Sequence, residues 1–245
     1  MREIVYHSQF EAEDKYWWFV ARNRILEKTV RSFCDLHPNF NMLDVGCGTG
    51  GFATLLKDDC NVIGIDTSDT ALSYSRKRGI NNLHNCLLNE FDSSMYGTIN
   101  AITMLDVIEH IEDDKSVVKD AYDLLPSGGI MIASVPAYQW LWSRHDEIHM
   151  HYRRYTIPNF KRLFTDAGFK VMYNSYYNSI LLLPAVLKRI MDKITGGDQK
   201  NDAPIDEVPE FINSLFTKIF LIEKNWIPNL MLPFGLSIIL VAKKM

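Results

Sequence analysis

The stretch NMLDVGCGTGGF, residues 41–52, constrains the fold of this chain more than any other segment. Met42, Leu43 and Val45 suit a short buried strand, and the glycines after them let the backbone turn tightly and approach a ligand. The apolar spacing that comes next predicts a helix over 50–58, whose free N–H groups would face that ligand. We therefore expect a ligand-binding loop between a strand and a helix.

The glycine spacing alone does not define the ligand. Gly46, Gly48 and Gly51 match the G-x-G-x-x-G spacing of dinucleotide-binding proteins, which is a weak signal by itself. Asp44 precedes the glycines, where a carboxylate suits a cationic ligand better than a pyrophosphate. Asp66 ends a second apolar run, where it can accept hydrogen bonds from both ribose hydroxyls. Together these residues favour a ligand with a ribose and a positively charged tail.

These residues, together with AITMLDVIEHI over 101–111, resemble the class I S-adenosylmethionine-dependent methyltransferases over about 40–136, with a continuation to the C-terminus. The segments W-S-x-H-D and H-Y-R-R-Y resemble the methyltransferase type 11/12-like group, whose acceptors are uncharacterised. The resemblance implies S-adenosyl-L-methionine as the cofactor. It places the methionine end at the D-x-G-x-G loop and the ribose at the acid after the second strand.

Residue by residue, the resemblance assigns to the cofactor Asp44, Gly46, Gly48, Gly50, Asp66, Thr67, Leu105 and Asp106. Many family members carry an acid after the third strand that meets the adenine amino group. This chain aligns Cys86 and Leu87 there, so we expect backbone and apolar contacts to hold the adenine.

Alternating strand and helix signals predict an α/β fold with a Rossmann-like, doubly wound, seven-stranded and mostly parallel sheet. The length of 245 residues and the 47% hydrophobic composition suit one large core, so we expect a single domain over 1–245. The strands are predicted near 40–45, 61–65, 83–87, 99–105, 129–135, 169–173 and 236–242, the last two forming an antiparallel C-terminal pair. Further helices are predicted over 68–78 and 113–125 and from Thr156 to Gly168.

Four parts of this domain can be distinguished: an N-terminal helical cap over 1–35, a cofactor-binding core over 36–136, a substrate loop over 137–157, and a helical insertion or lid over 175–233. The aromatic residues 16–19 of the cap either anchor it on the sheet or fold over the cofactor. In the second case Trp17 would contact apolar parts of the cofactor and Arg22 its methionine carboxylate.

The insertion contains two apolar helical runs, Ile180 to Ile194, interrupted by Pro184, and Phe211 to Trp226, separated by a polar loop over 195–204. Neither run reaches the roughly 20 residues that a transmembrane helix needs. The insertion is either a pair of helices that covers the substrate side of the sheet or an apolar lid for a lipid-linked substrate, with peripheral membrane contact.

The loop after the fifth strand lies where ligands approach an open α/β sheet, so it carries our acceptor-side candidates. His145 or His149 is the predicted general base, because an imidazole can take a hydroxyl proton near pH 7. The predicted substrate-binding residues are Trp142, His151, Arg153, Arg154 and Tyr155.

Other readings of this loop stay open. Arg153 and Arg154 either bind a phosphate or carboxylate of the acceptor or pair with Asp146 or Glu147. A metal held by His145, His149 and Asp146 is an alternative with a loose ligand set, so we expect no metal. His110, after the fourth strand, fits a structural or cofactor-proximal role better than that of a base.

Charge and cysteine content limit which partners and which cellular compartment we expect. The net charge of −4 gives no electrostatic case for nucleic acid. The four cysteines show neither disulfide nor zinc spacing, and the N-terminus carries charges where a signal peptide is apolar, so we expect a cytoplasmic protein. The sequence leaves the oligomeric state open.

The function predicted from the sequence is therefore O-methylation of a small-molecule acceptor, such as a sugar, a lipid-linked saccharide or a prenylated quinone. A nicotinamide-dependent oxidoreductase would explain the glycines and Asp66 but not Asp44. A non-catalytic cofactor-binding module would explain both carboxylates but would need no cluster of histidines.

Overall fold

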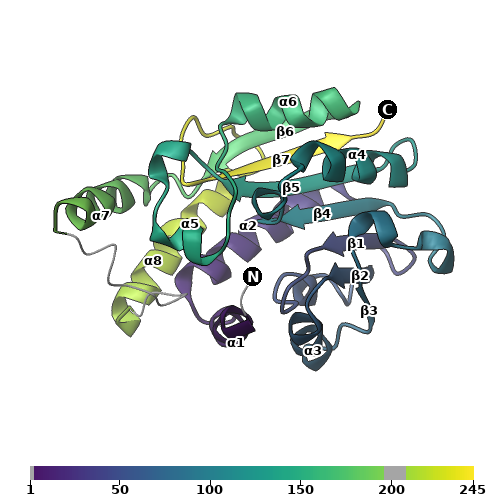
Figure 1. Ribbon diagram of the computed structural model, residues 1–245, viewed down its shortest axis with the longest axis horizontal. Coiled ribbons are helices and arrows are strands. Elements are labelled where there is room, and N and C mark those ends of the chain that lie inside the picture. The colour runs from purple at the N-terminus through teal and green to yellow at the C-terminus, as the bar shows by residue number, and fades with distance from the viewer. Residues whose placement is uncertain (1–2, 196–207) are drawn as a thin grey trace.

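The computed structural model describes residues 3–195 and 208–245, and the strands of this part form one seven-stranded sheet (Figure 1). The strands are β1 (Asn41–Val45), β2 (Asn61–Asp66), β3 (Asn82–Asn85), β4 (Ala101–Leu105), β5 (Ile130–Pro136), β6 (Lys170–Tyr177) and β7 (Ser237–Lys243). Their order is β3-β2-β1-β4-β5-β7-β6, and β7 runs antiparallel to both neighbours, whereas the other pairs are parallel. The predicted doubly wound sheet with an antiparallel C-terminal pair is confirmed.

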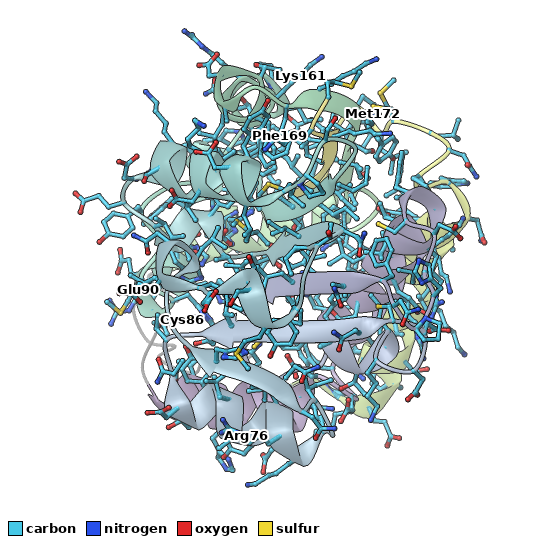
Figure 2. All side chains as sticks on the ribbon, turned by 90° about the vertical axis from the view of Figure 1, so that its right-hand side faces the viewer. Arg76, Cys86, Glu90, Lys161, Phe169 and Met172 are labelled. Carbon is cyan, nitrogen blue, oxygen red and sulfur yellow. The ribbon has the colours of Figure 1, made fainter. Side chains whose placement is uncertain are left out.

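Helices cover both faces of this sheet. The α-helices are α1 (Glu3–Ala12), α2 (Trp17–Phe33), α3 (Asp69–Lys77), α4 (Asp114–Leu124), α5 (Arg144–Ile148), α6 (Ile157–Ala167), α7 (Leu182–Thr195) and α8 (Glu210–Ile222). Successive strand residues point to opposite faces, so Leu43 packs in the core under α4 and α6, and Met42 packs in the core under α2 and α8. In Figure 2, Arg76 of α3 and Lys161 of α6 lie at opposite ends of the view, with the sheet between them.

Local sequence explains where the helices begin and end. The Ser68 side chain accepts a hydrogen bond from the Ala71 N–H and so caps α3, and Asp113 caps α4 in the same way through Ser116. Pro158 lies in the first turn of α6, and Gly168 ends that helix in the left-handed conformation with φ +107°, as the sequence predicted.

The predicted helix over 50–58 is wrong. Only a 3₁₀ turn, Ala53–Leu55, forms there. Gly50 takes φ +81°, which an α-helix does not allow, so the helix cannot start inside the glycine turn.

The insertion lies between β6 and β7, and β6 extends to Tyr177, beyond its predicted end. Pro184 falls in the first turn of α7 and does not interrupt it. Most of the predicted polar loop lies outside the described residues. Glu223, after α8, accepts hydrogen bonds from the backbone N–H groups of Ser179 and Ile180 and so fixes the segment that leads into α7. Among the described helices, none has the length and apolar character to cross a bilayer.

Candidate active site

A cavity of about 970 Å³ opens at the carboxyl ends of the parallel strands. In Figure 1, α5 and α7 lie beyond these strand ends, and α1 lies beside them. Residues that end or follow β1, β2, β4 and β5 line the cavity, together with residues of α1, α2, α5 and α7. This is the position at which open α/β sheets bind ligands.

The glycine loop after β1 borders the cavity. Gly46 and Gly48 take φ +66° and +55°, a conformation that favours glycine. A Cβ on Gly46 would lie 2.6 Å from Val107 Cγ2, whereas a Cβ on Gly48 would meet nothing nearer than Gln9 Nε2 at 3.5 Å. Gly46 therefore serves close packing, and Gly48 leaves open space in which a ligand can approach the backbone.

Gly50, also predicted to bind the cofactor, is not among the residues that line the cavity. A Cβ at Gly50 would lie 3.1 Å from the Ser75 Cα, so the glycine is needed for packing against α3. Its role in the structure is in the fold of the loop, and its contact with the cofactor stays a prediction.

Asp44 and Asp66 both line the cavity, as the sequence predicted. Asp44 is 3% exposed and accepts a hydrogen bond of 2.6 Å from the Thr103 hydroxyl. Burial raises the pKa of Asp44 to about 6. A buried carboxylate whose partner is a neutral hydroxyl suits a cationic ligand.

Asp66 accepts hydrogen bonds from the backbone N–H groups of Gly48, at 3.0 Å, and Ser68, at 2.9 Å, and burial raises its pKa. The neighbouring walls come from Thr67, Cys86 and Leu87, all three predicted to contact the cofactor. A carboxylate beside an apolar wall fits a ribose with an attached base. The cavity thus brings a carboxylate suited to a cation, Asp44, next to walls suited to a nucleoside.

The helical cap closes one side of the cavity. Arg22 of α2 forms a buried ion pair with Asp106, which follows β4, at 2.5 Å. Both residues were predicted to contact the cofactor, and both line the cavity with Leu105. Trp17 also lines it and packs edge-on against Phe216 and Phe220 of α8. Trp17 therefore anchors the cap on α8 and also borders the cavity, while its contact with the cofactor stays a prediction.

The sequence analysis missed wall residues at the N-terminus, among them Tyr6 and Gln9 of α1 and Glu13, which directly follows that helix. Glu13 is buried and accepts a hydrogen bond of 2.5 Å from the Thr49 hydroxyl in the glycine loop. No motif marks these positions, since their role depends on how α1 folds back on the loop.

Histidines gather at the other end of the cavity. The rings of His145 and His149 lie 4.1 Å apart between centroids, and each lies about 6 Å from the His151 ring, at 6.3 and 6.0 Å. His110 packs edge-on against His151 at 4.6 Å. Burial and the neighbouring His151 lower the pKa of His110 to about 3. Burial and the neighbouring His149 hold the pKa of His145 well below 6.5. The structure therefore adds His110 to the acceptor-side cluster. It also adds Glu109, which the sequence analysis did not consider.

The predicted substrate-binding residues divide into two groups. His151 and Arg154 line the cavity, and Arg154 forms an ion pair with the buried Asp146 at 2.7 Å. Arg153, Tyr155 and Trp142 are not among the lining residues. Arg153 pairs with Asp114 at 2.8 Å, and the Tyr155 hydroxyl donates to the same carboxylate, so these two side chains fix the loop against α4. Substrate binding by Arg153, Tyr155 and Trp142 therefore has no support from the cavity and stays a prediction.

Comparisons with known proteins agree with this geometry. The family model described as a methyltransferase domain matches residues 16–174. Phosphoethanolamine N-methyltransferase 3 of Arabidopsis thaliana is 27% identical over 183 residues, which cover 68% of this chain and 36% of that protein. The ubiquinone biosynthesis O-methyltransferase of Chromobacterium violaceum is 30% identical over 106 residues, 40% of this chain and 46% of that protein. The chain spans less than half of the length of either relative.

Among solved structures, a methyltransferase of Thermotoga maritima, described as a possible histamine N-methyltransferase, superposes with a TM-score of 0.53 at 18% identity. The alignment covers 94% of this chain and 93% of that one. The chain thus belongs to the methyltransferase domain family and is a class I S-adenosylmethionine-dependent methyltransferase. Its cofactor is S-adenosyl-L-methionine.

Proposed function

We propose that this protein transfers a methyl group to a hydroxyl oxygen of a small-molecule acceptor that carries an apolar chain. The observation that supports this proposal is the position of His145 and His149, which line the same cavity as Asp44 and Asp66 but belong to the loop after β5. A cofactor bound at the two carboxylates and a candidate proton acceptor would therefore share one cavity.

The cofactor-side roles follow from the contacts of each residue. Asp44 would hold the cationic methionine end, Asp66 the ribose hydroxyls, and Cys86 and Leu87 the adenine. Arg22 already pairs with Asp106, so we assign it to fixing the cap and neutralising that carboxylate at the cofactor site. When bound, S-adenosylmethionine supplies an electrophilic methyl group on a sulfonium.

On the acceptor side, an imidazole of His145 or His149 takes the proton of the acceptor hydroxyl. The oxygen forms its bond to the methyl carbon while the carbon–sulfur bond breaks, so the proton ends on the imidazole and the electron pair on sulfur. Much of the acceleration in such an in-line displacement comes from alignment in a site that excludes water. Side chains of α2 and α5 line the cavity and would shield the reacting atoms from water.

The insertion supports a lipid-linked saccharide as the acceptor. Lys188 and Arg189 of α7 line the cavity, where positive charge favours a phosphate. On the same helix Leu187 and Ile190 are exposed, and Phe211 of α8 is exposed as well. An apolar outer face beside a cationic inner face fits an acceptor that joins a lipid chain to a sugar through phosphate. The named relatives act on phosphoethanolamine and in ubiquinone biosynthesis, so a prenylated quinol and a phosphorylated amine are the acceptors to compare.

The deciding experiment follows methyl transfer from labelled cofactor to a lipid-linked saccharide, a prenylated quinol and a phosphorylated amine. His145→Ala and His149→Ala are tested on the acceptor that reacts. We expect at least one of them to lower turnover by roughly 10²–10⁴-fold, the usual contribution of a positioned base, with little change in adenosylhomocysteine affinity. His37→Ala, outside the cavity wall, is the control. Near wild-type turnover in both variants would contradict the role of a base.

Two results would overturn the broader assignment. Thermal stabilisation by NAD but not by adenosylhomocysteine would favour the oxidoreductase. Binding of adenosylhomocysteine without turnover on any acceptor would favour a non-catalytic module. A cytoplasmic location, where the cofactor is made available to the enzyme, is part of this proposal and is tested by fractionation of cells.

A further inference from the structure

Three potential metal ligands meet at the acceptor end of the cavity. Glu109 and His110 lie in the 3₁₀ turn Ile108–His110 after β4, and His151 lies in the loop after α5. One ligand atom of each residue lies within 4.8 Å of the other two. This set differs from the one considered from the sequence, because Asp146 is turned to other partners and Glu109 takes its place.

The buried side chain of Glu109 is incompletely hydrogen-bonded. The residue is 1% exposed, and its Oε2 atom is buried with no hydrogen-bond partner among the described residues. Leaving a carboxylate oxygen buried and unpaired costs folding free energy, so such a group is normally matched by a cation or a donor. Its backbone carbonyl accepts from the Tyr152 N–H at 2.8 Å, which holds the 3₁₀ turn against the histidine loop.

His151 has the environment of a metal-binding histidine. Its Nδ1 atom lies 2.9 Å from Asp146 Oδ1, and Asp146 is in turn fixed by Arg154 and by the Ser143 N–H at 2.9 Å. A carboxylate that holds one ring nitrogen sets the tautomer and leaves the other nitrogen, here Nε2, to bind a metal. Arg154 also donates to both oxygens of Asp146, so this carboxylate is already engaged and supports the histidine from behind.

From these contacts we infer that Glu109, His110 and His151 bind one divalent transition-metal ion. Two imidazoles and one carboxylate favour zinc, cobalt, manganese or iron over magnesium or calcium, which prefer all-oxygen sites. Three protein ligands at a cavity wall leave further coordination positions open, as in catalytic rather than structural sites. The sequence analysis expected no metal, and the inference revises that expectation.

The inference deepens the proposed function and rests on it for the identity of the acceptor. Asp106 directly follows β4 and Glu109 lies three positions further on, so an ion at the acceptor end would lie on the side that faces the cofactor. An acceptor with two neighbouring oxygens, such as the vicinal hydroxyls of a sugar, can fill two open positions. The ion would orient the reacting oxygen, while His145 or His149 stays available for its proton.

The test is the binding of Co²⁺ to full-length protein treated with chelator, followed by visible absorption and by competition with Zn²⁺ in calorimetry. We expect one ion per chain. Glu109→Gln and His151→Ala should each weaken binding by tenfold or more, and Asp146→Asn by about 10–100-fold, the usual effect of losing a carboxylate behind a metal-binding histidine. His37→Ala is the matched control, because it removes an imidazole outside the cavity wall.

Adenosylhomocysteine binding to the same variants separates this inference from the proposed function. Unchanged binding of adenosylhomocysteine in Glu109→Gln, a change that keeps the side-chain shape, shows that the variant is folded. Absence of stoichiometric Co²⁺ binding to the wild type, or Co²⁺ affinity unaffected by Glu109→Gln and His151→Ala, would overturn the metal site and leave the cofactor site intact. Failure of the wild type to bind adenosylhomocysteine would instead contradict the proposed function.

Discussion

Arg22 and Asp106 are 84 residues apart in the sequence and form a buried ion pair at the cofactor end of the cavity. The Arg22 Nε donates to Asp106 Oδ2 at 2.8 Å, and the Ser134 hydroxyl donates to the other carboxylate oxygen at 3.1 Å. Burial opposes the charge of Arg22, but Asp106 keeps the pKa of the guanidinium raised. The pair thus links the helical cap to the end of β4.

Asp106→Asn should lower the free energy of unfolding by about 2–3 kcal/mol, because it leaves a buried guanidinium without its counter-charge. Asp59→Asn is the matched control, since the Arg31–Asp59 pair has a similar distance of 2.8 Å but lies at the surface. The control should cost less than about 1 kcal/mol. Urea unfolding measures both, and equal effects of the two substitutions would contradict the importance of the buried pair.

Asp66→Ala should weaken adenosylhomocysteine binding by on the order of 1.5–3 kcal/mol, because the ribose would lose a charged acceptor. Calorimetric titration measures the change, and Asp35→Ala, an exposed carboxylate before β1, provides the comparison. An unchanged dissociation constant for Asp66→Ala would place the ribose elsewhere.

The pKa of Asp44 predicts opposite effects of pH on stability and on binding. The pKa of Asp44 in the folded protein, about 6, lies above the ordinary aspartate value of 3.8, so folding favours the protonated form. Without cofactor, the Asp44 contribution to stability is therefore lost as the pH rises from about 4 through about 6. Adenosylhomocysteine, with its cationic amino group, should instead bind more tightly as Asp44 ionises over that range. Titrations at about pH 5 and pH 7 test this, and Asp44→Asn should remove the difference.

Gly50→Ala should destabilise the fold without a specific effect on the cofactor. The new Cβ would meet Ser75 at 3.1 Å or less, and φ +81° strains any other residue. Gly97→Ala separates the two causes, since Gly97 has φ +71° and nothing within 4 Å of the added Cβ. We expect Gly97→Ala to cost about 1–2 kcal/mol from strain alone, and Gly50→Ala about 1–3 kcal/mol more from overpacking. Equal losses in thermal unfolding would show that packing on α3 is unimportant.

The exposed apolar face of α7 should contribute to binding of lipid vesicles. Replacing Leu187 and Ile190, which are 53% and 50% exposed, by asparagine should reduce co-sedimentation with phosphatidylglycerol vesicles several-fold. Met95→Asn alters an apolar residue that is even more exposed, at 74%, in the connection before β4, and it should leave binding unchanged. If all variants bind vesicles alike, the lipid-linked acceptor loses its structural support.

Most of the fold and of the cofactor side of the cavity could be predicted from local sequence. Strands with a buried run, such as 41–45, and the carboxylates Asp44 and Asp66 were predictable because each depends on a few neighbouring residues. The acceptor side was predictable only in part, because Glu109 and His110 reach the histidine loop through tertiary contacts. Arg153 and Arg154 look equivalent in the sequence, yet one pairs with Asp114 outside the cavity wall and the other with Asp146 at it. Glu109 gave no signal, since its burial depends on the loop that carries Tyr152.

Because the cap is anchored on α8, the part of this enzyme that folds cooperatively extends beyond the residues that match the family. The Trp17 N–H donates to the Asn213 side chain at 2.8 Å, across 196 residues, whereas the family match stops at residue 174. A fragment cut there would keep the glycine loop, both carboxylates and every cavity histidine named above, but it would leave the apolar side of α2 without Phe220. The segment that matches the family is therefore not expected to fold by itself, and transferring it into another protein requires α8 as well.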